Sequence, residues 1–174
     1  MFLYLISLFI ILTKNEKLVF VGIHFRHGSR APIKTSRHGL DRLGVKWDTP
    51  GELTAIGKRM HYILGLYNRK RYITEKYQFL SPKFDPHELQ VFSSDLNRTI
   101  LSATSHLQGL YPMSNEFGEK ITTEQYSKAF PPMNIKEEDY NEELNNLNDS
   151  ALPHYMTAIP IHLIDFSIQT PECD

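Results

Sequence analysis

LVFVGIHFRHGSRAP, residues 18–32, decides how this sequence is interpreted. Residues 18–25 are mostly apolar and rich in β-branched and aromatic side chains, which predicts a strand buried on both faces of a parallel sheet. The strand ends at a polar turn, residues 26–32, where two arginines flank His27 and Gly28. Ligands of open parallel sheets bind beyond the carboxyl ends of the strands. The sequence therefore predicts a ligand site at this turn.

Strand and helix patterns alternate downstream. A helix capped by Thr54 is expected to bury the apolar side chains of Ile56, Met60, Ile63, Leu64 and Tyr67. A strand at 89–92 precedes the capping residues Ser93, Ser94 and Asp95. A second helix follows, with Leu96, Ile100, Ala103, Leu107 and Leu110 on one side. With a further strand at 159–164, this order predicts an α/β fold with a mainly parallel sheet. Residues 113–152 lose the periodicity and are expected to form a loop or insertion.

Composition limits the class of protein. The 174 residues are 41% hydrophobic and 22% charged, as in one globular domain. A net charge of -1, from 19 basic and 20 acidic residues, gives no indication of nucleic-acid binding. With Cys173 as the single cysteine, an internal disulfide and a cysteine-ligated metal cluster are excluded for this chain.

The first residues form an apolar run that is too short for an ordinary membrane span. We expect a signal peptide over residues 1–13, and with it the secretory route. A buried first strand and an uncleaved anchor are the alternatives. The anchor would be the chain's only link to a membrane.

Three arginines are candidates for one anion site. Arg26 and Arg30 flank His27, and Arg98 follows the end of the second predicted strand by about one helical turn. Each guanidinium keeps its charge and can bind two phosphate or carboxylate oxygens. The pattern favours a phosphate-like ligand. Alternatively, the turn is exposed with solvated charges, and Arg98 pairs with Asp95 three residues earlier.

Three blocks make the interpretation more specific. RHGSRAP resembles the Arg-His-Gly-x-Arg-x-Pro signature of the histidine acid phosphatases, the acid phosphatase and phytase branch of the histidine phosphatase superfamily. GELTAIGKRMHYILGLYNRKRY, residues 51–72, and SSDLNRTILSA, residues 93–103, are similar to two further blocks of that family, in the same order.

The resemblance implies an acid phosphatase that forms a phosphohistidine. His27 would be the nucleophile, and Arg26, Arg30 and Arg98 would bind the phosphoryl oxygens of a small-molecule or protein phosphomonoester. The implied fold is a three-layer, phosphoglycerate-mutase-like α/β fold. The mechanism implies no metal and no other cofactor, and the family implies a secreted or lysosomal location.

One family feature is missing from the sequence. The family's general acid is supplied by a His-Asp dipeptide, and these 174 residues contain none. We therefore expect residues 17–174 to be the amino-terminal part of a histidine phosphatase domain, with an incomplete sheet and weak or no activity. The alternatives are a catalytically dead phosphate-binding relative and a small membrane-anchored protein.

Two tripeptides fit the pattern for N-glycosylation. The one at Asn148 lies in the polar region and is the predicted acceptor. The one at Asn97 overlaps Arg98 and is expected to be inaccessible in a folded site.

Overall fold

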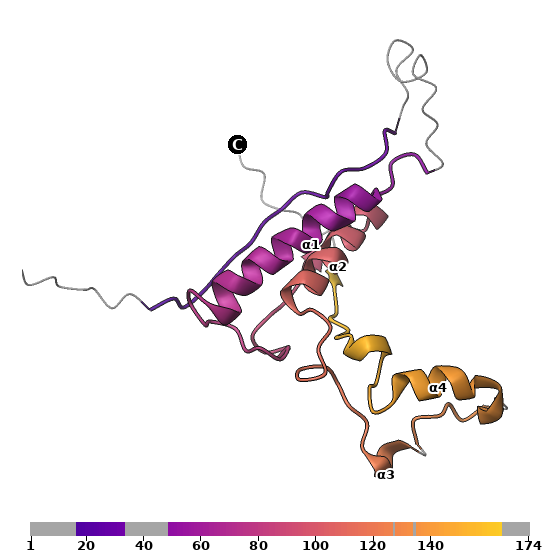
Figure 1. Cartoon of the computed structure of the whole chain (residues 1–174). Helices are drawn as coiled ribbons and strands as arrows, with labels where there is room; N and C mark the ends of the chain where they lie inside the picture. The colour runs from indigo at the N-terminus through magenta and orange to yellow at the C-terminus, as the bar shows by residue number, and fades with distance from the viewer. Residues whose placement is uncertain (1–16, 34–48, 127, 134, 165–174) are drawn as a thin grey trace, which may run out of the picture.

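The computed structural model describes residues 17–33, 49–126, 128–133 and 135–164 (Figure 1). The predicted signal peptide at 1–13 and Cys173 lie outside these residues. Within the described ranges, no helix is both long enough and apolar enough to cross a membrane.

Two helices packed against each other form the centre of the structure (Figure 1). These are α1, Ala55–Arg69, which continues into the π-helical turn η2, Lys70–Thr74, and α2, Asn97–Leu110. A Cβ on Gly65 of α1 would lie 2.0 Å from the carbonyl oxygen of His106, and one on Gly109 of α2 would lie 2.1 Å from that of Tyr62. The two glycines therefore let the helix backbones touch.

The start of α1 is as predicted, but the face that it buries is not. Thr54 caps the helix, its side chain accepting a hydrogen bond from the Gly57 amide at 3.1 Å. The side chains expected in the core are exposed, up to 69% at Ile56; they are Ile56, Met60, Ile63, Leu64 and Tyr67. The buried positions are instead Gly57, His61, Gly65 and Asn68. Close approach of the neighbouring backbones selects this small and polar face for burial.

The start of α2 also differs from the expectation. Its N-cap is Leu96, which makes no side-chain cap, rather than one of Ser93, Ser94 and Asp95. The Thr99 hydroxyl lies 2.8 Å from the Leu96 carbonyl oxygen and 2.9 Å from that of Ser94. This hydroxyl holds the turn that leads into the helix.

A small parallel sheet lies beside the helix pair. Strands β1, Phe92–Ser93, and β2, His162–Leu163, pair in the register Phe92 with His162. The α/β character and the parallel pairing are as predicted, with shorter strands. The apolar core joins η2 and the end of α2 to the segments that lead into the two strands. Its buried members are Ile73, Leu107, Leu110 and Tyr111, with Leu80, Phe84, Leu89, Val91, Ile159 and Ile161 packed against them.

The strand predicted at residues 18–25 does not form. The segment makes no ladder with any described residue, and Val19 and Phe20 are each 79% exposed. Its apolar side chains mark it for burial, but a strand also needs a neighbouring strand for its backbone groups. The three-layer arrangement remains a prediction.

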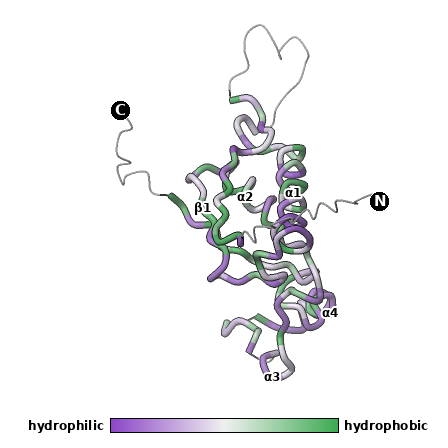
Figure 2. Tube along the Cα trace, turned by 90° about the vertical axis from the view of Figure 1, so that its left-hand side faces the viewer, coloured by the Kyte–Doolittle hydropathy of each residue, from purple (hydrophilic) through white to green (hydrophobic). Residues whose placement is uncertain are grey.

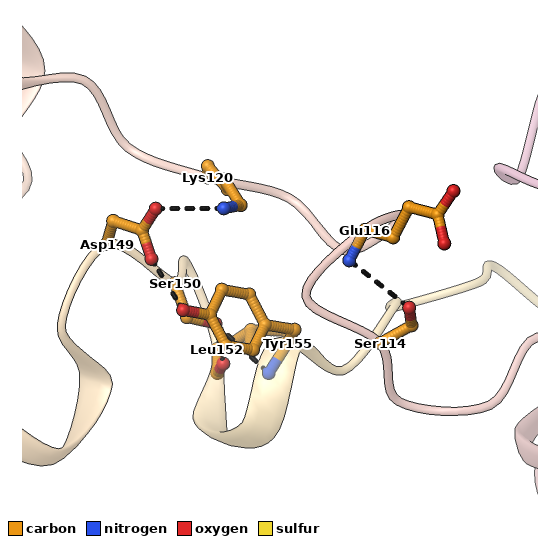
Figure 3. A network of polar contacts seen from close by, with 7 residues as sticks. All are labelled: Ser114, Glu116, Lys120, Asp149, Ser150, Leu152 and Tyr155. Carbon is orange, nitrogen blue, oxygen red and sulfur yellow. Dashed lines mark hydrogen bonds and ion pairs between the residues drawn. The ribbon is translucent and has the colours of Figure 1, made fainter.

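The described part of residues 113–152 contains the short helices α3, Thr123–Tyr126; η3, Glu137–Tyr140; and α4, Asn141–Leu147. A polar network with η4, Pro153–Tyr155, joins the two ends of this region (Figure 3). Lys120 and the Tyr155 hydroxyl both contact the Asp149 carboxylate, at 3.1 and 2.6 Å. Asn148, the predicted glycosylation acceptor, is exposed beside this network.

Candidate active site

The turn of residues 26–32 is held by the segment that leads into α1. The Ala31 amide donates to the Glu52 carbonyl at 2.9 Å, and Arg30 forms an isolated antiparallel bridge with Leu53. Both the amide and the hydroxyl of Thr54 donate to the Ser29 carbonyl, at 3.0 and 2.9 Å. Thr54 therefore starts α1 and fixes the turn at the same point.

Two glycines let the turn lie directly on α1. A Cβ on Gly28 would lie 2.5 Å from the Gly57 carbonyl oxygen, and one on Gly57 would lie 2.2 Å from that of Ser29. Any larger residue at either position would push the turn away from the helix.

A pocket of about 770 Å³ opens at this turn. Its lining comprises Phe25, Arg26, His27, Gly28, Ser29, Arg30 and Pro32 from the turn, and Met60, His61 and Leu64 from α1. The structure therefore brings three of the predicted site residues, Arg26, His27 and Arg30, into one concave surface. Two arginines therefore share this lining with the His27 imidazole.

The His27 ring is oriented by its own main chain. Nδ1 lies 2.8 Å from the Gly28 carbonyl oxygen. A carbonyl only accepts hydrogen bonds, so Nδ1 carries the proton of the neutral ring. The lone pair then lies on Nε2, the nitrogen farther from the backbone.

Arg98 is the second residue of α2 and does not belong to the pocket lining. Its backbone is nevertheless tied to the turn, because the Ser102 hydroxyl donates to the Arg98 carbonyl at 2.7 Å and accepts from the Gly28 amide at 3.1 Å. The ion pair with Asp95 does not form, and the Nε of Arg98 is buried without a hydrogen-bond partner among the described residues.

The neighbouring Asn97 corrects another expectation. This residue is exposed, and its side-chain amide donates to the Glu52 carboxylate at 3.2 Å. It lies on the outer side of the helix start, so the expected inaccessibility is wrong.

Two buried histidines lie behind the turn, and sequence reasoning missed the importance of His61. Its Nε2 is 3.1 Å from the Arg26 carbonyl oxygen, and its ring forms a cluster with those of Phe25 and His106, at 5.0 and 6.5 Å. Burial lowers the pKa of His61, and it lowers the pKa of His106 to about 4. The signal was present in the sequence, because His61 follows Gly57 by one helical turn and so shares its face.

The sequence of this chain is similar to those of known proteins. The model of the histidine phosphatase superfamily (branch 2) matches residues 17–160. Lysosomal acid phosphatase of Xenopus laevis is 36% identical over 101 residues, which are 58% of this chain and 22% of that protein. Putative acid phosphatase 11 of Caenorhabditis elegans is 44% identical over 106 residues, 58% of this chain and 24% of the relative.

A likeness to a solved structure was also found. The phytase from Citrobacter braakii aligns with a TM-score of 0.41 and 22% identity, over 59% of this chain and 31% of the phytase. The chain spans about a quarter of the length of the curated relatives that it matches. Because the family model covers most of the sequence, this chain belongs to branch 2 of the histidine phosphatase superfamily.

Proposed function

We propose that this chain carries the nucleophile and phosphate-binding residues of an acid phosphatase that acts on phosphate monoesters. The observation that supports the proposal best is His27, which lines one pocket together with Arg26 and Arg30 while the Gly28 carbonyl holds its Nδ1. An oriented nitrogen nucleophile that shares a pocket with guanidinium groups suits attack on a phosphate ester.

The reaction proceeds in two displacements. The Nε2 lone pair of His27 attacks phosphorus, the bond from phosphorus to the ester oxygen breaks, and that oxygen leaves as a phenolate or alkoxide that takes a proton from solvent. Water then attacks the phosphohistidine and loses a proton to solvent, while the P–N bond breaks, its electron pair returns to Nε2, and inorganic phosphate is released. The Nδ1 proton stays on its bond to the Gly28 carbonyl during the first step and helps to stabilise the positive charge on the ring.

The arginines act on the charge of the transferred group. That charge is spread over the equatorial oxygens in the transition state, where fixed guanidinium groups lower its free energy. Arg26 and Arg30, which line the pocket, would take this role from the turn, and Arg98 would take it from the start of α2.

The proposed substrate class is wide, and turnover in this chain is expected to be weak. Proton donation to a leaving oxygen contributes about 100- to 10,000-fold in rate, and the sequence contains no His-Asp dipeptide to supply it. Esters with good leaving groups should therefore react best. Since lysosomal and prostatic acid phosphatases are among the relatives, we place the protein on the secretory or lysosomal route.

Trapping of the phosphoenzyme tests the proposal. The purified chain is mixed with ³²P-labelled p-nitrophenyl phosphate, whose phenolate leaves without a proton, and is quenched rapidly at high pH. Phosphohistidine survives alkali and is lost in acid. We expect alkali-stable label on His27, no label in His27→Ala, and full label in His24→Ala, which removes an exposed histidine three residues away. Label that persists in His27→Ala would refute the assignment of the nucleophile.

A phosphate-binding protein without catalysis is the second candidate, favoured by the two arginines that line one pocket. Titration with inorganic phosphate, followed by ³¹P NMR, separates the two. Saturable phosphate binding with no label on His27 supports the binding protein, whereas label supports the phosphatase.

A further inference from the structure

The two peptide groups that flank His27 are both held by buried side chains. On the amino-terminal side, the Arg26 carbonyl lies 3.1 Å from Nε2 of His61. On the carboxyl-terminal side, the Gly28 amide donates to the Ser102 hydroxyl at 3.1 Å. The two partners come from different helices, α1 and α2, and lie 35 and 74 residues from their contacts in sequence. The backbone of His27 is therefore fixed at both ends.

Ser102 is suited to this position by its burial and by its second bond. The residue is 1% exposed, and its hydroxyl uses its single proton to donate to the Arg98 carbonyl at 2.7 Å. Its oxygen lone pair is thereby directed away from its own helix and toward the Gly28 amide. One hydroxyl links the turn that carries His27 to the turn of helix that carries Arg98.

The His61 ring is also buried and held in place by its contacts. It is 5% exposed, and its ring lies 5.0 Å from that of Phe25, the residue immediately before Arg26. Because its partner is a carbonyl, Nε2 must carry the proton and donate it. The other ring nitrogen, Nδ1, is buried without a hydrogen-bond partner among the described residues. A leucine would fill this space without an unsatisfied nitrogen, so the imidazole serves the contact with Arg26.

We infer that His61 and Ser102 are positioning residues that aim the His27 imidazole by fixing both of its flanking peptide groups. The inference deepens the proposed function and rests on it. With the two peptide planes fixed, the main chain of His27 has one orientation, and its bond to the Gly28 carbonyl then fixes the ring. A misplacement of about 1 Å in a nucleophile costs about 100-fold in rate, so loss of either contact should slow phosphorylation far more than it weakens substrate binding.

Ser102→Ala tests the contact on the α2 side, and the chain offers a matched control. Ser105 lies on the same helix and makes the same type of bond, its hydroxyl donating to the Leu101 carbonyl at 2.7 Å, but it does not contact the turn. We expect Ser102→Ala to slow phosphorylation of His27 by about 10- to 100-fold with little change in phosphate affinity. Ser105→Ala should leave both unchanged.

A second measurement does not depend on activity. Hydrogen exchange followed by NMR should show faster exchange of the Gly28 amide in Ser102→Ala and not in Ser105→Ala. If Ser102→Ala fails to fold, Ser102→Cys takes its place, because it keeps the volume while its sulfur is a weak acceptor. Equal exchange and equal phosphorylation rates in the Ser102 and Ser105 variants would overturn the inference for Ser102.

His61 is tested by a pair of variants. His61→Gln keeps a side-chain N–H that can reach the Arg26 carbonyl, whereas His61→Leu keeps comparable bulk without a donor. We expect the glutamine variant to phosphorylate at least 10-fold faster than the leucine variant, with equal thermal stability. Equal rates would show that the contact does not position His27.

The inference and the proposed function fail in different ways. If the unsubstituted chain takes no label, phosphoryl transfer is refuted. The positioning of His27 is then decided by Gly28 exchange and by the ¹⁵N shifts of the His27 ring, which report its tautomer. If the chain is labelled and the His61 and Ser102 variants match their controls, the function stands and the inference falls.

Discussion

Arg98 differs from the other two proposed phosphate ligands, because it lies on helix α2 rather than on the turn. Its Nε is buried and has no acceptor among the described residues. A buried donor without a partner costs about 1–3 kcal/mol, a cost that an anion bound between α2 and the turn would remove. The unsatisfied nitrogen is thus consistent with a ligand at this point, although Arg98 does not line the pocket.

Arg98→Ala should weaken the binding of inorganic phosphate. Hydrogen bonds to charged groups contribute about 1.5–3 kcal/mol, so we expect a dissociation constant at least about 10-fold higher, measured by ³¹P NMR or calorimetry. Arg59→Ala, which removes an exposed arginine of α1, is the control for net charge. Equal affinities in the two variants would show that Arg98 lies outside the phosphate site.

The pairing of α1 with α2 depends on two helical glycines. In an isolated helix, replacing glycine by alanine is stabilising by about 1 kcal/mol. At Gly65 the added methyl would lie 2.0 Å from the carbonyl oxygen of His106, so the helices must separate. The packing penalty should exceed the helical gain.

We therefore expect Gly65→Ala to lower the free energy of unfolding by about 1–3 kcal/mol, measured by urea denaturation. Gly22→Ala is the control, since a methyl there would meet the Phe20 ring at an ordinary 3.5 Å. Gly65→Ala with unchanged or higher stability would mean that the helices are not in backbone contact.

These elements show what the sequence could and could not predict. Local signals were sufficient for the start of α1, because a threonine cap acts within its own turn. They were misleading for its buried face, because hydropathy favours Ile56 and Met60 whereas backbone contact favours Gly57 and Gly65. The turn residues were identified by chemistry and order, but the contact of His61 with Arg26 spans 35 residues and has no local signal.

At the scale of the whole molecule, buried polar side chains on one face of α1 contrast with exposed apolar side chains on its other face. The buried face of α1 carries His61 and Asn68, while Ile56 and Ile63 on its other side are more than half exposed. Figure 2 shows hydrophobic and hydrophilic positions alternating along this helix. Patches of this kind promote contact with other apolar surfaces. Burial of His61 and His106, by contrast, disfavours the charged form of both rings.

The buried His106 ring makes the stability of the fold depend on pH. His106 is packed against Phe25 and His61, and its Nε2 lies 3.3 Å from the side-chain nitrogen of Asn68. Burial first, and the neighbouring His61 second, lower its pKa from 6.5 to about 4. The unfolded chain therefore binds a proton on this ring at a higher pH than the folded chain does. The contribution of this ring to stability is complete above about pH 6.5, is lost as the pH falls, and changes no further below about pH 4.

Between pH 7.5 and pH 4.5 this single group should cost about 2–3 kcal/mol in the free energy of unfolding, measured by urea denaturation at each pH. His106→Gln has no ring to titrate, so its loss of stability over the same interval should be smaller by that amount. His87→Gln, at an exposed histidine, should keep the full loss. An equal loss in His106→Gln would place the acid sensitivity elsewhere. If phosphate binds the folded chain as proposed, saturating phosphate should restore part of the stability at pH 4.5, and Arg98→Ala should reduce that rescue.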